Sequence, residues 1–417
     1  MIAVIGLGFV GLTTALGFCE KGFKVFGYDK DSGRARALKT GRVPFHEPGL
    51  DDALHRHLFT TNNFVITDDI TNSVEKAELV FYCVGTPGDE HGRVDLSYIY
   101  TALKDSLEGM ETNYKVLVVK STVPPSTTSL KIQPFIESLG LRVGYDVGLA
   151  NNPEFLREGF AWEDFMRPDR VVVGVSDNRS AEMLRKVYAT FNAPIHEVSP
   201  NTAEFIKYLS NTFLATLVSY SNEMAMVADT IGDIDIPGSF KILHQDRRWN
   251  GQPARMTNYV YPGCGYGGYC LPKDTEALCM ESAERRFEPQ ILKEVIKTNK
   301  RRRDFLVAKL LDEIDLNDRV GILGLAFKPD SDDIRESPSL YMIESLLAHG
   351  VKNLAAYDPL AVGNFRKAFQ LPINYRDTLE ELVEWADHLV ILTAWQEFKA
   401  NRQLIARKKV HDFRYCL

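Results

Sequence analysis

A repeated alternation of short apolar runs with helix-sized segments restricts the fold more than any other feature of the chain. Six runs in the first half are strand candidates: IAVIGLG, KVFGYD, LVFYCVG, KVLVVKST, VGLANNP and RVVVGVS. Strands that are apolar on both faces and separated by helices are typical of parallel sheets covered on both sides. The alternation returns near the end in RVGILGLAF, NLAAYDP, HLVILTA and KVHDF. We therefore expect an α/β protein with two doubly wound, Rossmann-like parallel-sheet domains.

The segment between these two regions has a different pattern. From Asn201 to Gly232 it holds no proline and no internal glycine, and its apolar residues recur at three- and four-residue spacing. This spacing predicts one long helix, of a kind that links domains or builds a dimer interface. A chain of 417 residues is too long for one core. We expect a Rossmann-like domain at 1–198, a long helix and helical dimerisation region at 199–300, and a second Rossmann-like domain at 301–417.

Composition and charge argue against several classes of partner. The 49 basic and 56 acidic side chains give a net charge of −7, which offers no electrostatic reason to expect nucleic acid or an anionic membrane. The amino terminus lacks the features of a signal peptide, and no apolar run reaches the roughly 18 residues of a membrane span. The six cysteines are scattered, without a CxxC pair or a histidine cluster. We expect reduced thiols in a cytoplasmic protein and no metal site.

The stretch VIGLGFVGL predicts a dinucleotide-binding turn. Gly6, Gly8 and Gly11 form a G-x-G-x-x-G pattern between an apolar strand and a helix-like segment. Such glycines permit a tight turn, a close approach to a pyrophosphate and close helix packing, and the helix N-terminus meets the phosphates. The next strand ends in Asp29, which would bind the ribose hydroxyls and repel a 2′-phosphate, so NAD is favoured over NADP. A turn that needs glycine only for packing does not account for this carboxylate.

The stretch PGCGYGGYCLPKDTEAL concentrates reactive groups on a glycine-rich backbone. Cys270 could attack a carbonyl carbon, and Lys273 and Lys207 would favour its thiolate if they lie close. Asp274 could hold or activate a water. Beside a dinucleotide site, such a cysteine suggests oxidation of an aldehyde through a thiohemiacetal and a thioester, which water hydrolyses to an acid. Packing alone explains the glycines but not these groups, whereas Cys264 is expected to be a packing residue.

Further polar groups stand directly after predicted strands, at the edge where α/β sheets bind ligands. They are Ser121 and Thr122, Glu154 and Glu158, and Lys328, Asp333 and Arg335. Lys207 and Asn211 lie four residues apart on the long helix and so share one face. Taken singly, each of these residues could equally be a turn residue or a solvated side chain.

With these motifs in order, the chain resembles the UDP-glucose 6-dehydrogenases within the UDP-glucose/GDP-mannose dehydrogenase family. The resemblance rests on GLGFVGL, VGTP, KSTVP, NPEFLREG, PDRVVVG, AEFIKYLSNTFLA, GYGGYCLPKDT, GLAFKPDSDDIRESPS and YDP. It implies NAD as cofactor, a homodimer built through the central helical region, and a C-terminal domain that binds the nucleotide of a UDP-sugar. It also implies a four-electron oxidation of UDP-glucose to UDP-glucuronate with two molecules of NAD.

The resemblance also implies residue roles. The catalytic set has Cys270 as nucleophile, Lys207 and Asn211 at the oxyanion, Asp274 and Thr122 positioning water and protons, and Glu154 as candidate base for thioester hydrolysis. The NAD-binding set is Gly6, Gly8, Phe9, Val10, Gly11, Asp29, Lys30, Arg34, Gly85, Thr86, Thr122, Glu158, Lys273 and Arg335. The substrate-binding set is Glu154, Phe155, Leu156, Arg157, Glu158, Lys207, Asn211, Arg255, Tyr259, Gly263, Gly267, Lys328 and Arg414. Arg255 stands near the position of the arginine that the family's dimer partner inserts.

Three other functions stay open on the sequence. The first is a 6-dehydrogenase of the same family for GDP-mannose or a UDP-N-acetylhexosamine, although GYGGYCLPKDT and PDRVVVG favour UDP-glucose. The second is a two-electron hydroxyacid dehydrogenase, which would have no use for Cys270. The third is a catalytically silent NAD-binding or assembly protein, which would not need Cys270, Lys207, Asn211 and Asp274 together.

Overall fold

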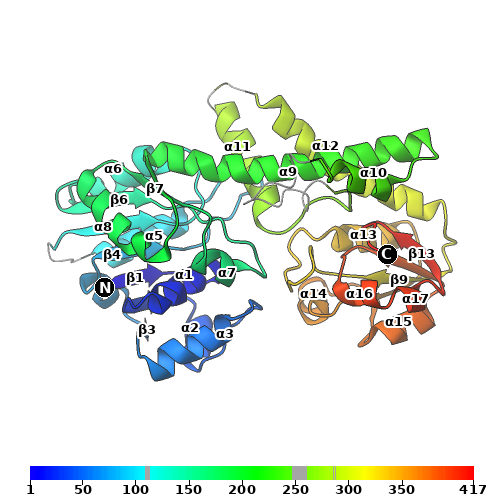
Figure 1. The fold of residues 1–417 in the computed structure, drawn as a ribbon, viewed down its shortest axis with the longest axis horizontal. Helices are drawn as coiled ribbons and strands as arrows, with labels where there is room; N and C mark the ends of the chain where they lie inside the picture. The colour runs from blue at the N-terminus through cyan, green and yellow to red at the C-terminus, as the bar shows by residue number, and fades with distance from the viewer. Residues whose placement is uncertain (109–112, 247–260, 285, 287) are drawn as a thin grey trace. The chain divides into compact units, whose positions relative to one another are not determined.

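The computed structural model describes residues 1–108, 113–246, 261–284, 286 and 288–417 (Figure 1). Within this part, the chain folds as two compact units, Met1–Leu209 and Ser210–Leu417. Each unit contains one twisted, mostly parallel sheet with helices packed against it (Figure 1). The expected α/β class with two Rossmann-like sheets is confirmed.

The sheet of the first unit has the strand order β3-β2-β1-β4-β5-β6-β7-β8. Neighbouring strands are parallel except β6 and β7, which pair antiparallel. The strands are β1 (Ile2–Ile5), β2 (Val25–Tyr28), β3 (Phe64–Thr67), β4 (Leu79–Tyr82), β5 (Lys115–Val119), β6 (Val147–Asn151), β7 (Val171–Val175) and β8 (Ile195–Val198). The order reverses between β1 and β4, which makes the end of β1 the switch point where nucleotides bind in such sheets.

Helices cover both faces of this sheet, as the apolar strand pattern predicts. Along β1, Ile2 and Val4 face one core, whereas Ala3 and Ile5 face another, because successive strand residues point to opposite faces. The helical segments are α1 (Phe9–Glu20), α2 (Ser32–Lys39), α3 (Leu50–His55), η1 (Arg56–Thr60), α4 (Ile70–Glu75), α5 (Ser97–Leu107), η2 (Thr128–Ile132), α6 (Gln133–Ser138), α7 (Ala161–Met166), α8 (Asn178–Tyr188) and η3 (Ala189–Phe191).

The second unit has a smaller parallel sheet with the order β11-β10-β9-β12-β13. Its strands are β9 (Arg319–Leu323), β10 (Asn353–Tyr357), β11 (Asn374–Tyr375), β12 (His388–Ile391) and β13 (Lys409–Asp412). Its helices are α10 (Ile236–Leu243), α11 (Cys270–Glu284), α12 (Gln290–Leu311), α13 (Pro338–Ala348), α14 (Val362–Phe369), α15 (Leu379–Trp385), α16 (Gln396–Ala400) and α17 (Arg402–Ile405). A single large apolar core joins the sheet to α12, α13, α14 and α15.

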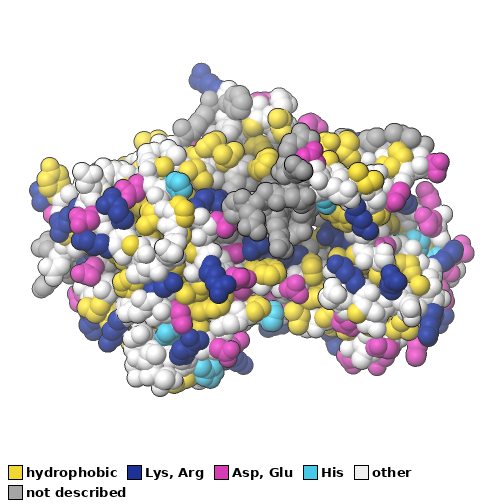
Figure 2. Space-filling view, in the orientation of Figure 1, with side chains coloured by type: hydrophobic (Ala, Val, Ile, Leu, Met, Phe, Trp, Pro, Cys, Tyr) yellow, Lys and Arg dark blue, Asp and Glu magenta, His cyan; other side chains and the backbone are white. Residues whose placement is uncertain are grey.

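Helix α9 runs from Pro200 to Ile231 without a break, within one residue of the predicted range at each end. Its exposed side chains include a line of large apolar residues at helical spacing: Phe205, Leu209, Phe213 and Tyr220, each about half exposed. Figure 2 shows hydrophobic side chains along the course of this helix. An exposed apolar stripe of this kind marks a surface suited to a further protein contact. Among the described residues, no helix combines the length and the apolar character needed to cross a membrane.

The turn after β1 in the first unit and the turn after β9 in the second unit are locked in the same way. Gly6 has a φ of +90°, and the amide of the next residue, Leu7, donates to the Asp29 carboxylate at the end of β2, at 2.7 Å. The second unit repeats this arrangement after β9 and β10 with Gly324, Leu325 and Asp358, where φ is +98° and the bond is again 2.7 Å. The similarity between the two ends of the sequence therefore extends to a shared backbone lock.

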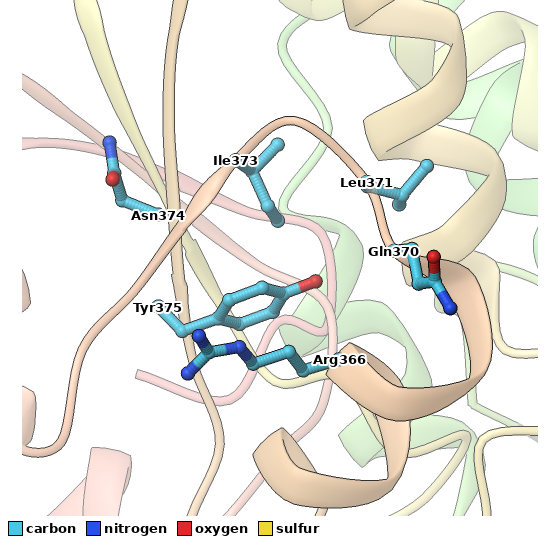
Figure 3. A pocket seen from close by; sticks show the side chains of 6 residues that line it. All are labelled: Arg366, Gln370, Leu371, Ile373, Asn374 and Tyr375. Carbon is cyan, nitrogen blue, oxygen red and sulfur yellow. The ribbon is translucent and has the colours of Figure 1, made fainter.

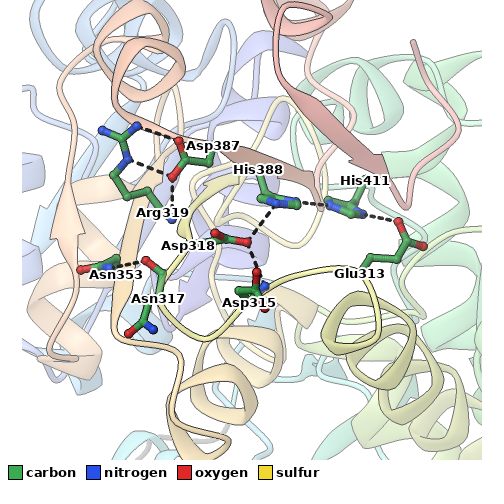
Figure 4. Close-up of polar contacts among 9 residues, drawn as sticks. All are labelled: Glu313, Asp315, Asn317, Asp318, Arg319, Asn353, Asp387, His388 and His411. Carbon is green, nitrogen blue, oxygen red and sulfur yellow. Dashed lines mark hydrogen bonds and ion pairs between the residues drawn. The ribbon is translucent and has the colours of Figure 1, made fainter.

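A polar network fixes the amino ends of β9 and β12 in the second unit (Figure 4). The buried rings of His388 and His411 lie nearly parallel, 11° apart, and are joined by a hydrogen bond of 2.9 Å between their ring nitrogens. His388 also lies 3.2 Å from a carboxylate oxygen of Asp318, and His411 lies 3.4 Å from one of Glu313. Burial lowers the pKa of His411, against the attraction of Glu313. This network lies opposite the carboxyl ends of the strands, so it stabilises the sheet and leaves the ligand-binding edge to other groups.

Candidate functional site

The glycine turn of the first unit has the shape that a dinucleotide requires. Gly6 adopts a left-handed conformation that favours glycine, and a Cβ on Gly11 would lie 1.7 Å from the Gly6 carbonyl oxygen. Gly8 precedes helix α1, and a Cβ there would meet nothing within 4 Å. The turn therefore leaves an open space before a helix N-terminus, which suits a diphosphate. Gly85, in the turn after β4, is equally open.

Asp29 is buried at the end of β2, and its carboxylate also serves the turn itself. Besides Leu7, it accepts hydrogen bonds from the Asp31 amide and from the Arg34 guanidinium, each at 2.8 Å. A carboxylate has about four acceptor positions, so capacity for one ribose hydroxyl is left. The other predicted cation, Lys30, instead lies over the Tyr98 ring, 3.9 Å from its centre.

The remaining predicted NAD contacts of this unit are Phe9, Val10, Thr86, Thr122 and Glu158. The Thr86 hydroxyl donates to the carbonyl oxygen of Thr122 at 2.9 Å, which ties the loops after β4 and β5 together. Phe9 packs against Phe45 with the ring centres 5.6 Å apart. Val10 and Glu158 are half-buried. The residues present thus fit a dinucleotide.

Glu154 and Lys207 form a buried ion pair in the first unit. Lys207 Nζ lies 2.9 Å from Glu154 Oε1, and both side chains are less than a tenth exposed. The other carboxylate oxygen accepts the Leu156 amide at 2.7 Å. Burial alone would raise the pKa of Glu154, but the charge and hydrogen bond of Lys207 outweigh it and the pKa is lowered. Glu154 is therefore held as a carboxylate.

The substrate-binding residues predicted after β6 have separate surroundings. Two cations lie near the Phe155 ring, with the Arg170 guanidinium 4.3 Å and Lys207 Nζ 5.6 Å from its centre. Arg157 is exposed and makes a two-point ion pair with Asp164. The structure thus brings Phe155 to Lys207, and turns Arg157 toward the surface.

In the second unit, Cys270 is exposed at the first position of α11. Asp274, one turn later, is fully buried and accepts hydrogen bonds from Lys273, at 2.6 Å, and from the Asn211 side chain of α9. Burial opposes the charge of Lys273, but the neighbouring Asp274 carboxylate outweighs it and raises the pKa of Lys273. Three of the predicted catalytic residues, Asn211, Cys270 and Asp274, therefore come together within one unit.

The glycines before Cys270 are required by contacts with the protein itself. A Cβ on Gly267 would lie 2.2 Å from the Glu336 carbonyl oxygen, and one on Gly263 would lie 2.3 Å from the Arg414 guanidinium. Cys264 between them is buried in the apolar core, and burial raises the pKa of its thiol to about 11, as expected for a packing residue. Packing therefore accounts for these glycines without a ligand.

Two cations flank the aromatic ring next to the cysteine. Arg335 lies 4.5 Å and Lys273 5.5 Å from the centre of the Tyr269 ring. Arg335 also pairs with Asp333 through its guanidinium, at 2.6 Å, and Lys328 stands over the neighbouring Phe327 ring at 5.5 Å. The loop after β9 thus presents positive charge beside the start of α11. Arg255 and Tyr259, both predicted for the substrate, lie outside the described residues.

Sequence reasoning overlooked Lys120 and Asn152, which are buried beside Glu154. The signal available was a lysine ending an apolar strand, followed on the next strand by two asparagines. Among the described residues, no group of three His, Cys, Asp or Glu side chains could hold a metal ion.

Two surface cavities lie apart from all of these residues. One, of about 440 Å³, is lined by Arg366, Gln370, Leu371, Ile373, Asn374 and Tyr375, at the amino end of β11 (Figure 3). The Arg366 guanidinium lies beside the Tyr375 ring there. The other, of about 200 Å³, is an apolar groove between α9 and α10 that includes Tyr220, Met224 and Phe240.

Comparison with known proteins gives consistent matches along the chain. Models of the UDP-glucose/GDP-mannose dehydrogenase family match as its NAD binding domain over residues 1–192, its central domain over 201–301 and its UDP binding domain over 321–417. The chain is 37% identical over 414 residues to a UDP-glucose 6-dehydrogenase of Pseudomonas aeruginosa, covering 95% of this chain and 88% of that protein.

Solved structures agree with these matches. A UDP-glucose dehydrogenase from the hyperthermophilic archaeon Pyrobaculum islandicum superposes with a TM-score of 0.92 at 34% identity, covering 100% of this chain and 94% of that one. A UDP-D-ManNAc dehydrogenase from Pyrococcus horikoshii superposes with a TM-score of 0.86 at 28% identity, covering 100% and 96%.

Proposed function

Because the chain belongs to the UDP-glucose/GDP-mannose dehydrogenase family and carries its NAD-binding domain, we propose that it oxidises UDP-glucose to UDP-glucuronate. The observation that carries the proposal is Cys270 at the start of α11, one turn before the buried Asp274 that Lys273 and Asn211 hold. The UDP-binding domain supports a UDP-sugar as substrate. The relative from P. aeruginosa supports glucose as the sugar.

The reaction follows from the chemistry of the thiol. NAD, when bound, accepts a hydride in each of two oxidations, so four electrons leave C6 of the sugar. Cys270 adds its sulfur to the carbonyl carbon of the aldehyde formed first, giving a thiohemiacetal. Loss of hydride from that carbon leaves a thioester, and water then releases the carboxylate and returns the thiol. The N-terminus of α11 favours the thiolate, since helix dipoles stabilise negative charge there.

The other predicted catalytic residues have matching tasks. Lys207 and Asn211, one turn apart on α9, stabilise the oxyanion of the adduct by charge and hydrogen bonding. Asp274 and Thr122 position water and protons. Glu154, held as a carboxylate, accepts a proton from the water that hydrolyses the thioester. The NAD- and substrate-binding residues predicted from the sequence remain part of the same proposal.

A panel of sugar nucleotides with NADH counted per product tests the function. We expect turnover with UDP-glucose and two NADH per acid formed, whereas Cys270→Ser should stall after the first oxidation or trap an adduct. Cys264→Ala, in the same loop, is the matched control and should keep the stoichiometry. One NADH per substrate with activity retained in Cys270→Ala would instead indicate a two-electron dehydrogenase.

A second candidate is a UDP-N-acetylhexosamine or GDP-mannose 6-dehydrogenase. The similarity to the UDP-D-ManNAc dehydrogenase of P. horikoshii supports it, because that structure covers the whole chain. The same panel separates the two: turnover with one of these substrates and none with UDP-glucose would refute our choice of sugar.

The proposal includes a homodimer built through the central region. The apolar stripe of α9 supports it, since Phe205, Leu209, Phe213 and Tyr220 would be covered in such an assembly. The groove beside α10 continues this apolar surface within the second unit. Sedimentation should give a mass twice that of the chain, and Phe213→Asp should shift it toward the monomer. A monomeric wild type at micromolar concentration would contradict this part of the proposal.

A further inference from the structure

Lys120 is a buried lysine to which the proposed mechanism gives no task. It follows β5 directly and is 4% exposed. Its ammonium donates to Asn152 Oδ1 at 2.9 Å and lies 5.8 Å from the centre of the Phe165 ring. No carboxylate in the described part of the chain lies within ion-pair distance of it. Full burial of a lysine without such a partner is rare, because charge is costly to desolvate.

The hydrogen bonds of Asn152 fix the position of this ammonium. The Asn152 side-chain amide donates to the Val172 carbonyl oxygen at 2.7 Å, and its Oδ1 also accepts the Tyr188 hydroxyl. These partners determine which end of the amide faces Lys120, since only the oxygen can accept from an ammonium. The lysine is therefore held in one place by β7 and α8.

Asn152, which holds Lys120, stands two residues before Glu154, and the side chains of Lys120, Glu154 and Lys207 are all buried. Burial lowers the pKa of Lys120 to about 8, with Cys83 and Glu154 opposing this shift and Lys207 adding to it. The groups that face it are thus the Cys83 thiol, whose pKa burial raises to about 12, the Glu154 carboxylate, the Lys207 ammonium and the Tyr188 hydroxyl. The Glu154 carboxylate acts on both ammonium groups, Lys207 and Lys120.

We propose that Lys120 is a positioning residue that keeps the Glu154–Lys207 pair ionised and leaves these three buried side chains with a net positive charge. Glu154 alone would cancel the charge of Lys207. With Lys120 protonated, the three groups sum to one positive charge, which an oxyanion beside Lys207 requires. With Lys120 deprotonated, the sum is zero and that stabilisation is lost. This inference rests on the proposed function, because it matters only if Glu154 and Lys207 serve the reaction.

Three substitutions separate this role from a structural one. Lys120→Met removes the charge at similar length, and Lys120→Arg keeps a charge that does not titrate below pH 12. Lys115→Met is the matched control: Lys115 is also a buried lysine of β5, with a pKa lowered by burial, but it donates to the Val74 carbonyl oxygen. The measurements are kcat and KM for UDP-glucose from pH 6 to 10, with thermal unfolding to confirm folding.

We expect the wild-type kcat to fall above about pH 8 as Lys120 loses its proton. In Lys120→Arg this fall should move up by more than about one pH unit. In Lys120→Met, kcat should drop at least about tenfold and its acid limb should move to higher pH, because Glu154 loses a neighbouring cation. The KM for NAD should stay within about twofold in both variants. The inference would be overturned if the pH profile of kcat did not shift in either Lys120 variant. It would also be overturned if Lys115→Met showed the same shifts.

A second readout does not depend on activity. Because the folded pKa of Lys120 lies below its unfolded value, the unfolded chain binds more protons between these two values. The difference in unfolding free energy between wild type and Lys120→Met should therefore rise from pH 8 to pH 10. A flat difference would overturn the inference even in an active enzyme. A rising difference in a protein that oxidises none of the panel would instead refute the proposed function while the buried charge of Lys120 stands.

Discussion

Replacing Asp29 should weaken the fold of the first unit as well as NAD binding. Its carboxylate accepts the amides of Leu7 and Asp31 at 2.7 and 2.8 Å, in a buried position. Asp29→Ala leaves both amides without an acceptor, but only the Leu7 amide is buried, because Asp31 is exposed and water can replace its bond. An unsatisfied buried amide costs about 1–3 kcal/mol, so the free energy of unfolding should fall by about that amount. Loss of the Arg34 contact adds little, since that side chain is partly exposed.

The effect can be localised and controlled. Urea unfolding gives the total loss, and hydrogen exchange of the peptide that contains Leu7 shows whether the turn has opened. The matched control is Asp358→Ala, which removes the same lock in the second unit. Both variants should be destabilised, but only Asp29→Ala should lose NAD affinity in calorimetry and gain relative affinity for NADP.

Two results would refute the reasoning. A change in unfolding free energy below about 0.5 kcal/mol in Asp29→Ala would show that water replaces the carboxylate at these amides. Unchanged preference for NAD over NADP would show that Asp29 does not face the ribose. The first result tests the structural role of Asp29 in the turn, and the second tests its role in cofactor selection. Either role can therefore be refuted without the other.

Three further predictions concern other groups of the same structure. Lys207→Met should lower the free energy of unfolding in urea by about 3–5 kcal/mol, because Glu154 is left buried without its ion-pair partner. Adding Glu154→Gln should recover part of this loss. A loss below about 1 kcal/mol, as for an exposed ion pair, would contradict this. Burial raises the pKa of Glu204 to about 7. The unfolding free energy of Glu204→Gln should therefore equal that of the wild type below pH 4.5 and exceed it by up to about 3 kcal/mol above pH 7. A variant as stable as the wild type at both pH values would refute this. Gly11→Ala should weaken NAD binding at least about tenfold in calorimetry, since its Cβ would collide with the Gly6 carbonyl. If the variant binds NAD as tightly as the wild type, helix α1 can move enough to accept the added methyl group, and the prediction is wrong.

Most of the fold could be predicted because buried parallel strands have a simple pattern. Every strand candidate coincides with a strand of the structure, and α9 spans the expected range. The strands that were missed, β3, β8 and β11, all lie at sheet edges. Edge strands need not be apolar on both faces: the residues of β8 are partly buried or exposed, and β11 has only two residues. The antiparallel pairing of β6 and β7 was also missed, because buried strands have the same apolar composition whether they pair parallel or antiparallel.

The site was predictable where a residue type determines its chemistry. Cysteine, lysine and aspartate after a glycine loop suggest covalent catalysis from the sequence alone, and the structure brings Asp274 to Asn211. The double use of Asp29 could not be foreseen, because its bonds to the turn depend on how β1 and β2 end. Lys120 was overlooked for a similar reason: the sequence shows a lysine after an apolar run, but only the fold shows that it is buried.

Two units that lock their first turn with the same glycine, leucine and aspartate are what duplication of one ancestral α/β segment would leave. In such a history the lock is the inherited part, and the residue that follows it is where the copies diverged. Gly8 leaves the space before α1 open, whereas Ala326, its counterpart, is buried and donates its own amide to Asp358. In such a history, one copy kept the opening that a dinucleotide requires and the other closed it, while the lock stayed the same.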